Sequence, residues 1–236
     1  MAELRTALIT GAARGIGRAT VDALLAAGLR VLALDRNFEG GAMVASGPLE
    51  LVRLDLADLA AIPPRMAELG RIDVLVNNAG VQNGLPIERY TDEARTRLLR
   101  VNLEAPVELI RIVSKQMIER GHGRIVNLTS VAAYTPHQDI WYGVSKAGIV
   151  SFTRSFAALL GPHGVQVNAV APGPIQTDML RRAAAPARRE QLMKAVYSKR
   201  AGRPDEVAGV IRWLVTDAPA LLNGAVIDVT DGSFLR

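Results

Sequence analysis

A tyrosine and a lysine spaced like one turn of a helix are the residues of this chain best suited to proton chemistry. Tyr142 and Lys146 are four positions apart, and residues four apart on an α-helix lie on one face. A free tyrosine, with a pKa near 10, is a poor base at neutral pH. A neighbouring ammonium group favours the phenolate by opposite charge. The pair therefore predicts a general acid–base of the kind needed when hydride transfer interconverts a carbonyl and an alcohol.

A serine twelve residues before Tyr142 predicts a second polar contact for the substrate. Ser130 follows the apolar run 123–128, so its hydroxyl is expected to project from the end of a strand. There it would hydrogen-bond a substrate oxygen and position that oxygen against Tyr142. Thr129 is an alternative for the same role.

A glycine-rich segment near the N-terminus predicts dinucleotide binding. Gly11, Gly15 and Gly17 stand between a short apolar run and a helical pattern. Such a turn lets the backbone approach a pyrophosphate, which then lies at the free N–H groups of the helix N-terminus. The spacing G-x-x-x-G-x-G differs from the familiar G-x-G-x-x-G, and glycines that only make a tight turn are the alternative.

An acidic residue at the end of the second apolar run favours NAD over NADP. Asp35 lies eighteen residues after Gly17, where a carboxylate can accept hydrogen bonds from the adenosine ribose. Arg14 and Arg36 favour NADP instead, because a guanidinium can bind the 2′-phosphate. The carboxylate carries more weight, since a phosphate beside it would bring like charges together.

The pattern of apolar runs predicts how these residues are held. Seven runs rich in Val, Ile and Leu are expected to form strands, near residues 4–10, 30–35, 49–54, 72–77, 123–128, 164–170 and 225–229. Helices are expected between them, near residues 15–28, 58–70, 91–120, 140–161, 178–200 and 204–217. Strands that are apolar on both faces and alternate with helices indicate a parallel sheet covered on both sides. The predicted fold class is α/β. It is a Rossmann-like, doubly wound parallel sheet of about seven strands, whose binding crevice lies beyond the strand C-termini.

The chain is expected to form one domain over residues 1–236. Its 236 residues are 49% hydrophobic, enough for one large α/β core, and no linker rich in Pro, Gly or Ser divides them.

Taken in order, these motifs resemble the classical short-chain dehydrogenase/reductase family. The motifs are residues 10–17, residues 77–80, Ser130, the pair Tyr142 and Lys146, and residues 172–173. The resemblance runs essentially from end to end. It implies an NAD(P)-dependent oxidoreductase that interconverts a ketone and a secondary alcohol. Either a 3-oxoacyl thioester or a cyclic alcohol such as a dihydrodiol would be the substrate.

The resemblance also implies roles for individual residues. The implied catalytic residues are Asn102, Ser130, Tyr142 and Lys146. The implied cofactor-binding residues are Gly11, Arg14, Gly15, Ile16, Gly17, Asp35, Asp55, Leu56, Asn78, Ala79, Gly80, Tyr142, Lys146, Pro172, Gly173, Ile175 and Thr177. Asp55 is alternatively a plain helix cap, and Asn102 is alternatively a polar residue that satisfies a helix kink.

The loop between Ser130 and Tyr142 is the part that this family uses to contact substrate. The expected wall of the substrate pocket is Asn83, His137, Gln138 and Trp141.

Composition argues against several other classes of protein. The chain has no cysteine and only three histidines, which lack metal-ligand spacing, so no metal site is expected. The net charge of +5 comes from arginines scattered along the helices, and no nucleic-acid motif accompanies them. No apolar run approaches the roughly 18–20 residues of a membrane span, and the N-terminus lacks the pattern of a signal peptide. A soluble, cytoplasmic protein with a small-molecule substrate is expected.

Two long helices predict self-association. Val107, Ile110 and Val113 on one, and Ile149, Phe152 and Phe156 on the other, exceed what a single sheet-facing stripe requires. Members of the family commonly pair these helices across a two-fold axis, which implies a homotetramer. The competing function is a dinucleotide-binding sensor or scaffold without turnover. A protein of that kind is expected to lack one of Ser130, Tyr142 or Lys146, and all three are present here.

Overall fold

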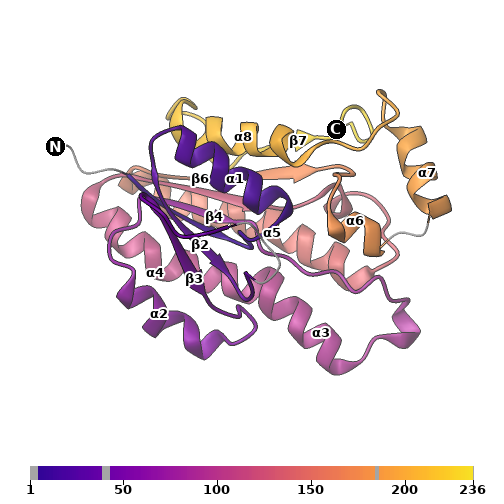
Figure 1. Ribbon diagram of the computed structural model, residues 1–236, viewed down its shortest axis with the longest axis horizontal. Coiled ribbons are helices and arrows are strands. Elements are labelled where there is room, and N and C mark those ends of the chain that lie inside the picture. The colour runs from indigo at the N-terminus through magenta and orange to yellow at the C-terminus, as the bar shows by residue number, and fades with distance from the viewer. Residues whose placement is uncertain (1–4, 39–42, 184–185, 236) are drawn as a thin grey trace.

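A seven-stranded parallel sheet forms the centre of the computed structural model, which describes residues 5–38, 43–183 and 186–235 (Figure 1). The strands are β1 (Thr6–Thr10), β2 (Arg30–Asp35), β3 (Leu49–Arg53), β4 (Val74–Asn77), β5 (Gly123–Leu128), β6 (Val165–Pro172) and β7 (Val226–Val229). Their order across the sheet is β3-β2-β1-β4-β5-β6-β7. The predicted fold class is therefore confirmed, and each predicted strand is present to within three residues; position 4 lies outside the described residues.

The central strands are built from side chains that suit burial on both faces. All five residues of β1 and all four of β4 are buried. Alternate residues of these strands belong to opposite cores: Ile9 packs with α1 (Gly15–Ala26) and α8 (Pro204–Thr216), whereas Leu8 packs with the helices of the other face. Successive side chains on a strand point to opposite sides, so an uninterrupted apolar run fills both cores at once.

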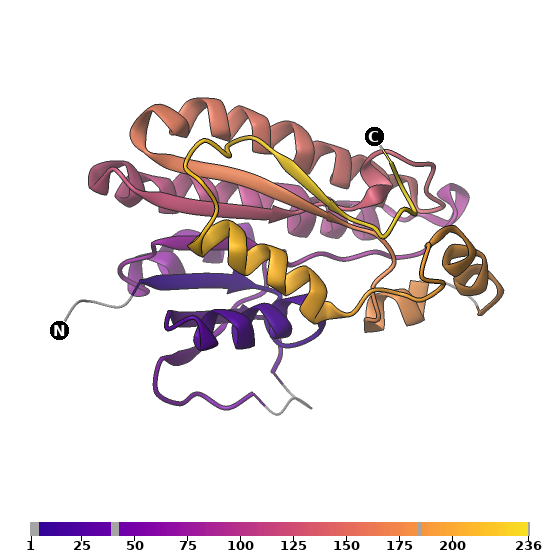
Figure 2. The ribbon, with the colours of Figure 1, turned by 90° about the horizontal axis from the view of Figure 1, so that it is seen from above.

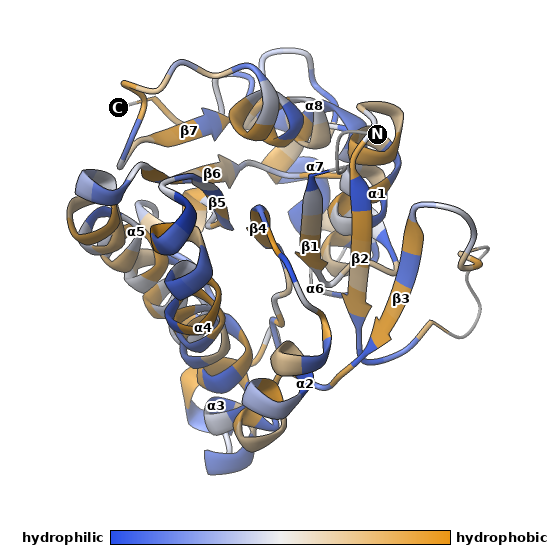
Figure 3. Cartoon of the chain, turned by 90° about the vertical axis from the view of Figure 1, so that its left-hand side faces the viewer, coloured by the Kyte–Doolittle hydropathy of each residue, from blue (hydrophilic) through white to orange (hydrophobic). Residues whose placement is uncertain are grey.

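Two layers of helices cover the sheet, as Figure 2 shows from above. Helices α1 and α8 contact each other on one face. The second core is formed with α2 (Ile62–Glu68), α4 (Ala105–Arg120) and α5 (Ile140–Leu160). Figure 3 shows the strands as mainly hydrophobic segments between these layers. No helix of the described residues is long and apolar enough to cross a membrane.

Two predicted helices are wrong in their extent. The expected helix 91–120 is divided into α3 (Asp92–Leu99), a π-helical turn (Arg100–Glu104) and α4. The expected helix 178–200 consists of α6 (Asp178–Ala183) and α7 (Pro186–Ala195), and residues 184–185 lie outside the described residues. Pro186 begins α7, a position where proline is common because its fixed φ suits the first turn of a helix.

The first turn after β1 requires a glycine because the backbone of α1 approaches β1 closely. A Cβ atom on Gly17 would lie 2.0 Å from the carbonyl oxygen of Gly11. That separation is far below any van der Waals contact. Because Gly17 has no side chain, the N-terminus of α1 can lie against the end of β1, where the candidate site begins.

Candidate active site

A cavity of about 390 Å³ lies beyond the C-terminal ends of the central strands. The chain runs from β1 outward through β2 to β3, then crosses back to β4 on the other side of β1. Open α/β sheets bind ligands at this reversal of strand order. The glycine-loop residues Gly11 and Gly15 line one part of the cavity, and Tyr142 and Lys146 line another.

Tyr142 is held at the first turn of α5. Asp139 is the N-cap of this helix, and its side chain accepts a hydrogen bond from the Tyr142 N–H at 3.1 Å. Burial raises the pKa of Tyr142 to about 12, against the opposing effect of a hydrogen bond from the Ser130 side chain. A phenol with this pKa remains protonated at neutral pH, as a proton donor must.

Lys146 lies one turn further along α5, with its ammonium group inside the cavity wall. Its Nζ donates to the Leu128 carbonyl at 2.8 Å and lies 5.5 Å from the centre of the Tyr142 ring. Burial lowers the pKa of Lys146 to about 8. The prediction that Lys146 lowers the pKa of Tyr142 is therefore not met by the protein's own groups, because burial dominates and raises that pKa.

Ser130 and Thr129 differ in what their hydroxyls contact. The Thr129 hydroxyl donates to the Lys146 carbonyl at 2.7 Å and is buried against α5. The Ser130 hydroxyl accepts from the Ala132 N–H at 3.2 Å, and its influence lowers the pKa of Tyr142. The Thr129 hydroxyl thus already donates to α5, whereas the Ser130 hydroxyl keeps its proton for another acceptor.

Asn102 lies behind the cavity wall and supports it through hydrogen bonds. It lies in the π-helical turn, is fully buried, and is absent from the cavity wall. Its side-chain oxygen accepts from the Val81 N–H at 2.8 Å, and its amide donates to the Val81 carbonyl and the Ser145 hydroxyl, each at 3.0 Å. The side chain thus ties the segment after β4 to α5, which agrees with the alternative that it satisfies a helix irregularity.

The glycine loop and Asp35 form the other end of the cavity. The carboxylate of Asp35 accepts hydrogen bonds from the Ala13 N–H at 3.0 Å and the Asn37 N–H at 3.3 Å. Arg14 and Arg36 also line the cavity and are exposed. The cavity wall therefore carries both a carboxylate that would repel a 2′-phosphate and guanidinium groups that would attract one.

Asn78 supports the glycine loop from the neighbouring strand. Its side-chain amide donates to the Thr10 carbonyl at 2.8 Å and the Gly11 carbonyl at 3.1 Å. The Thr10 hydroxyl in turn accepts from the N–H groups of Asn78 and Ala79. This network joins β1 to β4 across the reversal point.

The remaining residues expected to hold a cofactor also reach the cavity wall, with one exception. Those that line it are Ile16, Asp55, Leu56, Ala79, Gly80, Pro172, Gly173, Ile175 and Thr177. Gly17 does not, because it is buried against Gly11. Asp55 also accepts from the Ala57 N–H and pairs with Arg97 at 2.9 Å, so it stabilises the local turn as well.

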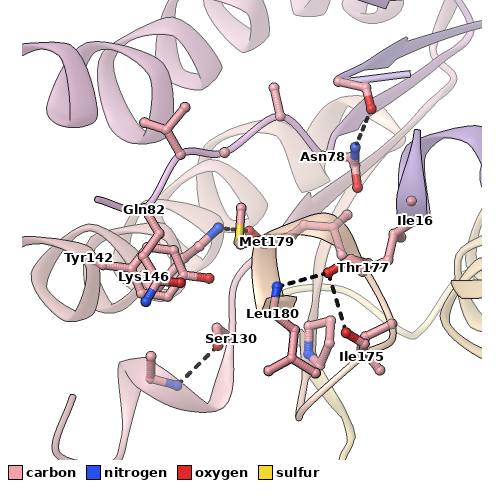
Figure 4. Close-up of a pocket in the computed structure, with 18 of the residues that line it drawn as sticks. Ile16, Asn78, Gln82, Ser130, Tyr142, Lys146, Ile175, Thr177, Met179 and Leu180 are labelled. Carbon is pink, nitrogen blue, oxygen red and sulfur yellow. Dashed lines mark hydrogen bonds between the residues drawn. The ribbon is translucent and has the colours of Figure 1, made fainter. Parts of the chain in front are cut away.

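Thr177 connects the cavity to α6, as Figure 4 shows. Its hydroxyl donates to the Ile175 carbonyl at 3.3 Å and accepts from the Leu180 N–H at 3.4 Å. Met179 and Leu180, the next residues of α6, line the cavity beside it.

Of the four residues predicted for the substrate wall, two lie at the cavity and two do not. His137 and Gln138 line the cavity, whereas Asn83 and Trp141 do not. The Asn83 amide turns outward to the Tyr90 hydroxyl at 3.0 Å. Trp141 precedes Tyr142 on α5 and so points to a different side of the helix, where the Arg95 guanidinium lies 5.7 Å from the centre of its ring.

Several lining residues were missed by sequence reasoning. Among them are Gln82, Thr135, Pro136, Met179, Leu180 and Leu192. Gln82 could have been included from the sequence, because it follows Gly80 by two positions in the segment after β4. Leu192 could not, since its approach to the cavity depends on where α7 lies in the fold. Arg188 also lines the cavity, and an arginine of the pairs 181–182 and 188–189 near an anionic substrate was the less favoured alternative to a solvated helix face.

Asp139 is the buried carboxylate that connects the loops around Tyr142. It is 0% exposed. One oxygen accepts from the Tyr90 hydroxyl at 2.7 Å and the Tyr142 N–H, and the other accepts from the N–H groups of Asn83 and Gly84 at 2.9 and 3.0 Å. Four donors therefore satisfy a charge that would otherwise be costly to bury.

Within residues 5–38, 43–183 and 186–235, no group of three or more His, Cys, Asp or Glu side chains is arranged to hold a metal ion.

Comparison with known proteins identifies relatives along the whole chain. The family model described as short chain dehydrogenase matches residues 5–188. The D-threitol dehydrogenase of Mycolicibacterium smegmatis is 36% identical over 98% of this chain and 92% of its own length. The 3-oxoacyl-acyl-carrier-protein reductase of Escherichia coli is 34% identical over 99% of this chain and 98% of its own length.

A solved structure shares the same architecture. It is a gluconate 5-dehydrogenase from Burkholderia cenocepacia in complex with NADP and tartrate. It superposes with a TM-score of 0.87 and is 33% identical, covering 97% of this chain and 94% of that one.

Proposed function

The chain belongs to the short-chain dehydrogenase family, and from this premise we propose that it interconverts a ketone and a secondary alcohol with a nicotinamide cofactor. One observation carries the proposal. Tyr142, Lys146 and Ser130 line the same cavity as the glycine loop and Asp35. A proton donor and a dinucleotide cradle at one reversal of strand order suit hydride transfer.

The lining residues fit a dinucleotide. Gly11 and Gly15 present backbone without side chains at the cavity wall, and the first turn of α1 follows directly. Free N–H groups at a helix start bind phosphate. When bound, the cofactor supplies or takes up the hydride.

The chain's own residues would then manage the substrate oxygen. In reduction, Tyr142 gives its phenolic proton to the oxygen that becomes the hydroxyl, and in oxidation it removes the same proton. Ser130 hydrogen-bonds that oxygen and fixes it against Tyr142. Lys146 contributes positive charge, which favours the phenolate once the proton has left.

NAD is the proposed cofactor, with NADP as the alternative. Asp35 supports NAD, because its carboxylate is held by two backbone N–H groups and cannot easily turn away from a 2′-phosphate. Arg14, Arg36 and the NADP in the related gluconate 5-dehydrogenase favour the alternative.

The test is an absorbance screen at the band of the reduced nicotinamide, with both cofactors against a panel of alcohols and ketones. Turnover is expected with at least one pair, and kcat/KM is expected to be higher with NAD. Asp35→Ala should narrow that preference, since Arg14 and Arg36 remain to bind the 2′-phosphate. A wild-type protein that is more efficient with NADP would contradict the cofactor assignment while leaving the reaction class intact.

The substrate is proposed to be a small molecule with one reacting carbonyl or hydroxyl group. The relatives include a threitol dehydrogenase and a 3-oxoacyl reductase, so both a polyol and an acyl thioester belong in the panel.

A further inference from the structure

Beside Tyr142, the cavity presents two polar side chains that the proposed proton transfer does not use. Gln82 comes from the segment after β4, and His137 from the loop before α5; both line the cavity. Their Nε2 atoms are 3.3 Å apart. The imidazole ring of His137 lies 5.0 Å from the phenol ring of Tyr142, centre to centre. Figure 4 shows Gln82 on the same side of the cavity as Tyr142 and Lys146.

The surroundings of His137 select one form of its ring. The N–H of Asp139, a fully buried residue, lies 3.1 Å from Nδ1 of His137. Nδ1 also lies 3.1 Å from the Asp139 carbonyl oxygen, but that carbonyl already accepts the Gly143 N–H in the first turn of α5. If Nδ1 carried the proton, the Asp139 N–H would lose its acceptor, and an unpaired buried N–H is costly. Nδ1 is therefore assigned as the acceptor, which leaves Nε2 as the donor in the neutral ring.

The pair keeps a donor and an acceptor free for a ligand. The Nε2–H of His137 donates to the carboxamide oxygen of Gln82 once the amide is oriented to suit. The Gln82 amide N–H groups then remain as donors, and the second lone pair of its oxygen remains as an acceptor. His137 is the single hydrogen-bond partner found for the Gln82 side chain among the described residues. A hydroxyl group both donates and accepts, so it matches such a pair better than a carboxylate, which only accepts.

We propose that His137 and Gln82 bind a second hydroxyl of the substrate, so that the preferred substrate is a vicinal diol or the corresponding α-hydroxy ketone. Tyr142 handles the oxygen that changes oxidation state, and the neighbouring pair holds the oxygen on the adjacent carbon. Oxygens on adjacent carbons are separated by about one hydrogen-bond length. The neighbouring rings of Tyr142 and His137 can therefore each contact one of the two oxygens. This inference rests on the proposed oxidoreductase function and specifies its substrate class.

The experiment compares alcohols of equal carbon number. The oxidation of 2-butanol, 2,3-butanediol and 2-hydroxybutanoate is followed with NAD and with NADP, and cyclohexanol is compared with cis-1,2-cyclohexanediol. In each set, the diol is expected to have a kcat/KM about tenfold or more above the mono-alcohol, because a site built to hydrogen-bond a hydroxyl discriminates against its absence.

Gln82→Met is the decisive variant, since methionine keeps the length of the side chain and removes both polar atoms. It should lower kcat/KM for the diols by about tenfold and leave that for the mono-alcohols within about twofold. Gln166→Met, at the opposite end of the sheet where the Gln166 amide contacts the Ala220 carbonyl, is the matched control and should change neither value.

The possible outcomes distinguish a failure of the hydroxyl site from a failure of the proposed oxidoreductase function. Equal kcat/KM for diols and mono-alcohols, or a diol preference that survives Gln82→Met, would overturn the hydroxyl site alone. A preference for 2-hydroxybutanoate over the diol would show that the pair binds a carboxylate and not a hydroxyl group. That result would also overturn the hydroxyl site. Oxidation of none of these alcohols with either cofactor would count against the oxidoreductase function and the site together.

Discussion

Tyr142 is the residue on which the proposed chemistry depends. Its phenol lines the cavity, and its pKa is raised by burial to about 12. Tyr142→Phe removes the transferable proton but keeps the ring, so turnover is expected to fall by about 10²–10⁴-fold. Cofactor affinity, measured by fluorescence titration, should remain nearly unchanged. Retention of more than about a tenth of the wild-type rate would contradict a general acid–base role.

Lys146 predicts a pH dependence of stability. Burial lowers its pKa to about 8, below the ordinary lysine value near 10.4. Between these two values the unfolded chain binds more protons than the folded one, so stability rises with pH across the window. Relative to Lys146→Met, the unfolding free energy of the wild-type protein should increase by about 3 kcal/mol from pH 7 to pH 10.4.

Denaturant titrations of both proteins at several pH values measure this difference directly. Tyr142 is present in both, so its own titration is common to the two curves. A difference that stays constant from pH 7 to pH 10.4 would show that the Lys146 ammonium is not destabilised by burial. Lys146→Met should also lower turnover, because the positive charge beside the phenol is lost.

At the scale of single residues, the sequence predicted which side chains share the cavity better than it predicted the contacts that hold them there. Tyr142 and Lys146 are four positions apart, and this spacing brings two side chains close together on any α-helix. The role of Asp139 does not, because its partners at Asn83, Gly84 and Tyr90 come from the segment after β4. No local pattern indicates which buried carboxylate will collect donors from two distant loops.

Among the elements, the first turn of α5 is held by its N-cap, Asp139. Asp139→Ala would leave four donors without their acceptor and is expected to cost about 3 kcal/mol or more of unfolding free energy. Asp139→Asn keeps an acceptor oxygen and should cost less. Both variants should lower kcat by displacing Tyr142, with Asp139→Asn the milder of the two.

Thr91→Ala is the matched control for this prediction. Thr91 is the N-cap of α3, where its side chain accepts from the Ala94 N–H at 3.2 Å. Its loss should cost about 1 kcal/mol without changing kcat. If Asp139→Ala and Thr91→Ala had equal effects on stability and turnover, Asp139 would be an ordinary helix cap.

The elements themselves were largely predictable, because parallel strands buried on both faces give continuous apolar runs. The runs at 30–35 and 123–128 match β2 and β5 residue for residue. The π-helical turn at Arg100–Glu104 was not predictable. One extra residue in a turn hardly alters the apolar period, and the hydrogen bonds that Asn102 makes from this turn join it to Val81, a residue distant in sequence.

For the whole molecule, the predicted apolar surface for self-association is smaller than the sequence indicated. Ile110, Val113 and Ile149 are buried within the chain itself. The sequence predicted these residues on a second apolar side of each helix, facing another subunit. The apolar period of a helix does not show whether a neighbouring helix of the same chain or another subunit covers such a residue. On α4 and α5, Val107 (36% exposed), Val144 (48%) and Leu159 (63%) remain at the surface.

A homo-oligomer, expected to be a tetramer, remains the prediction for this surface. Light scattering at micromolar concentration should give a mass four times that of one chain. Leu159→Arg should reduce the mass, whereas Val44→Arg, at a 73% exposed position between β2 and β3, should not. A wild-type monomer would rule out the prediction.

The strand order also governs what happens while the chain is being synthesised. β1 is the first strand made, yet its neighbour β4 is made more than sixty residues later. Until then, one edge of a strand whose five residues are all destined for burial stays open to other chains. The nascent protein therefore carries the glycine loop and Asp35 long before Tyr142 exists. Its period of greatest exposure to aggregation ends when the second half of the sheet docks against the first.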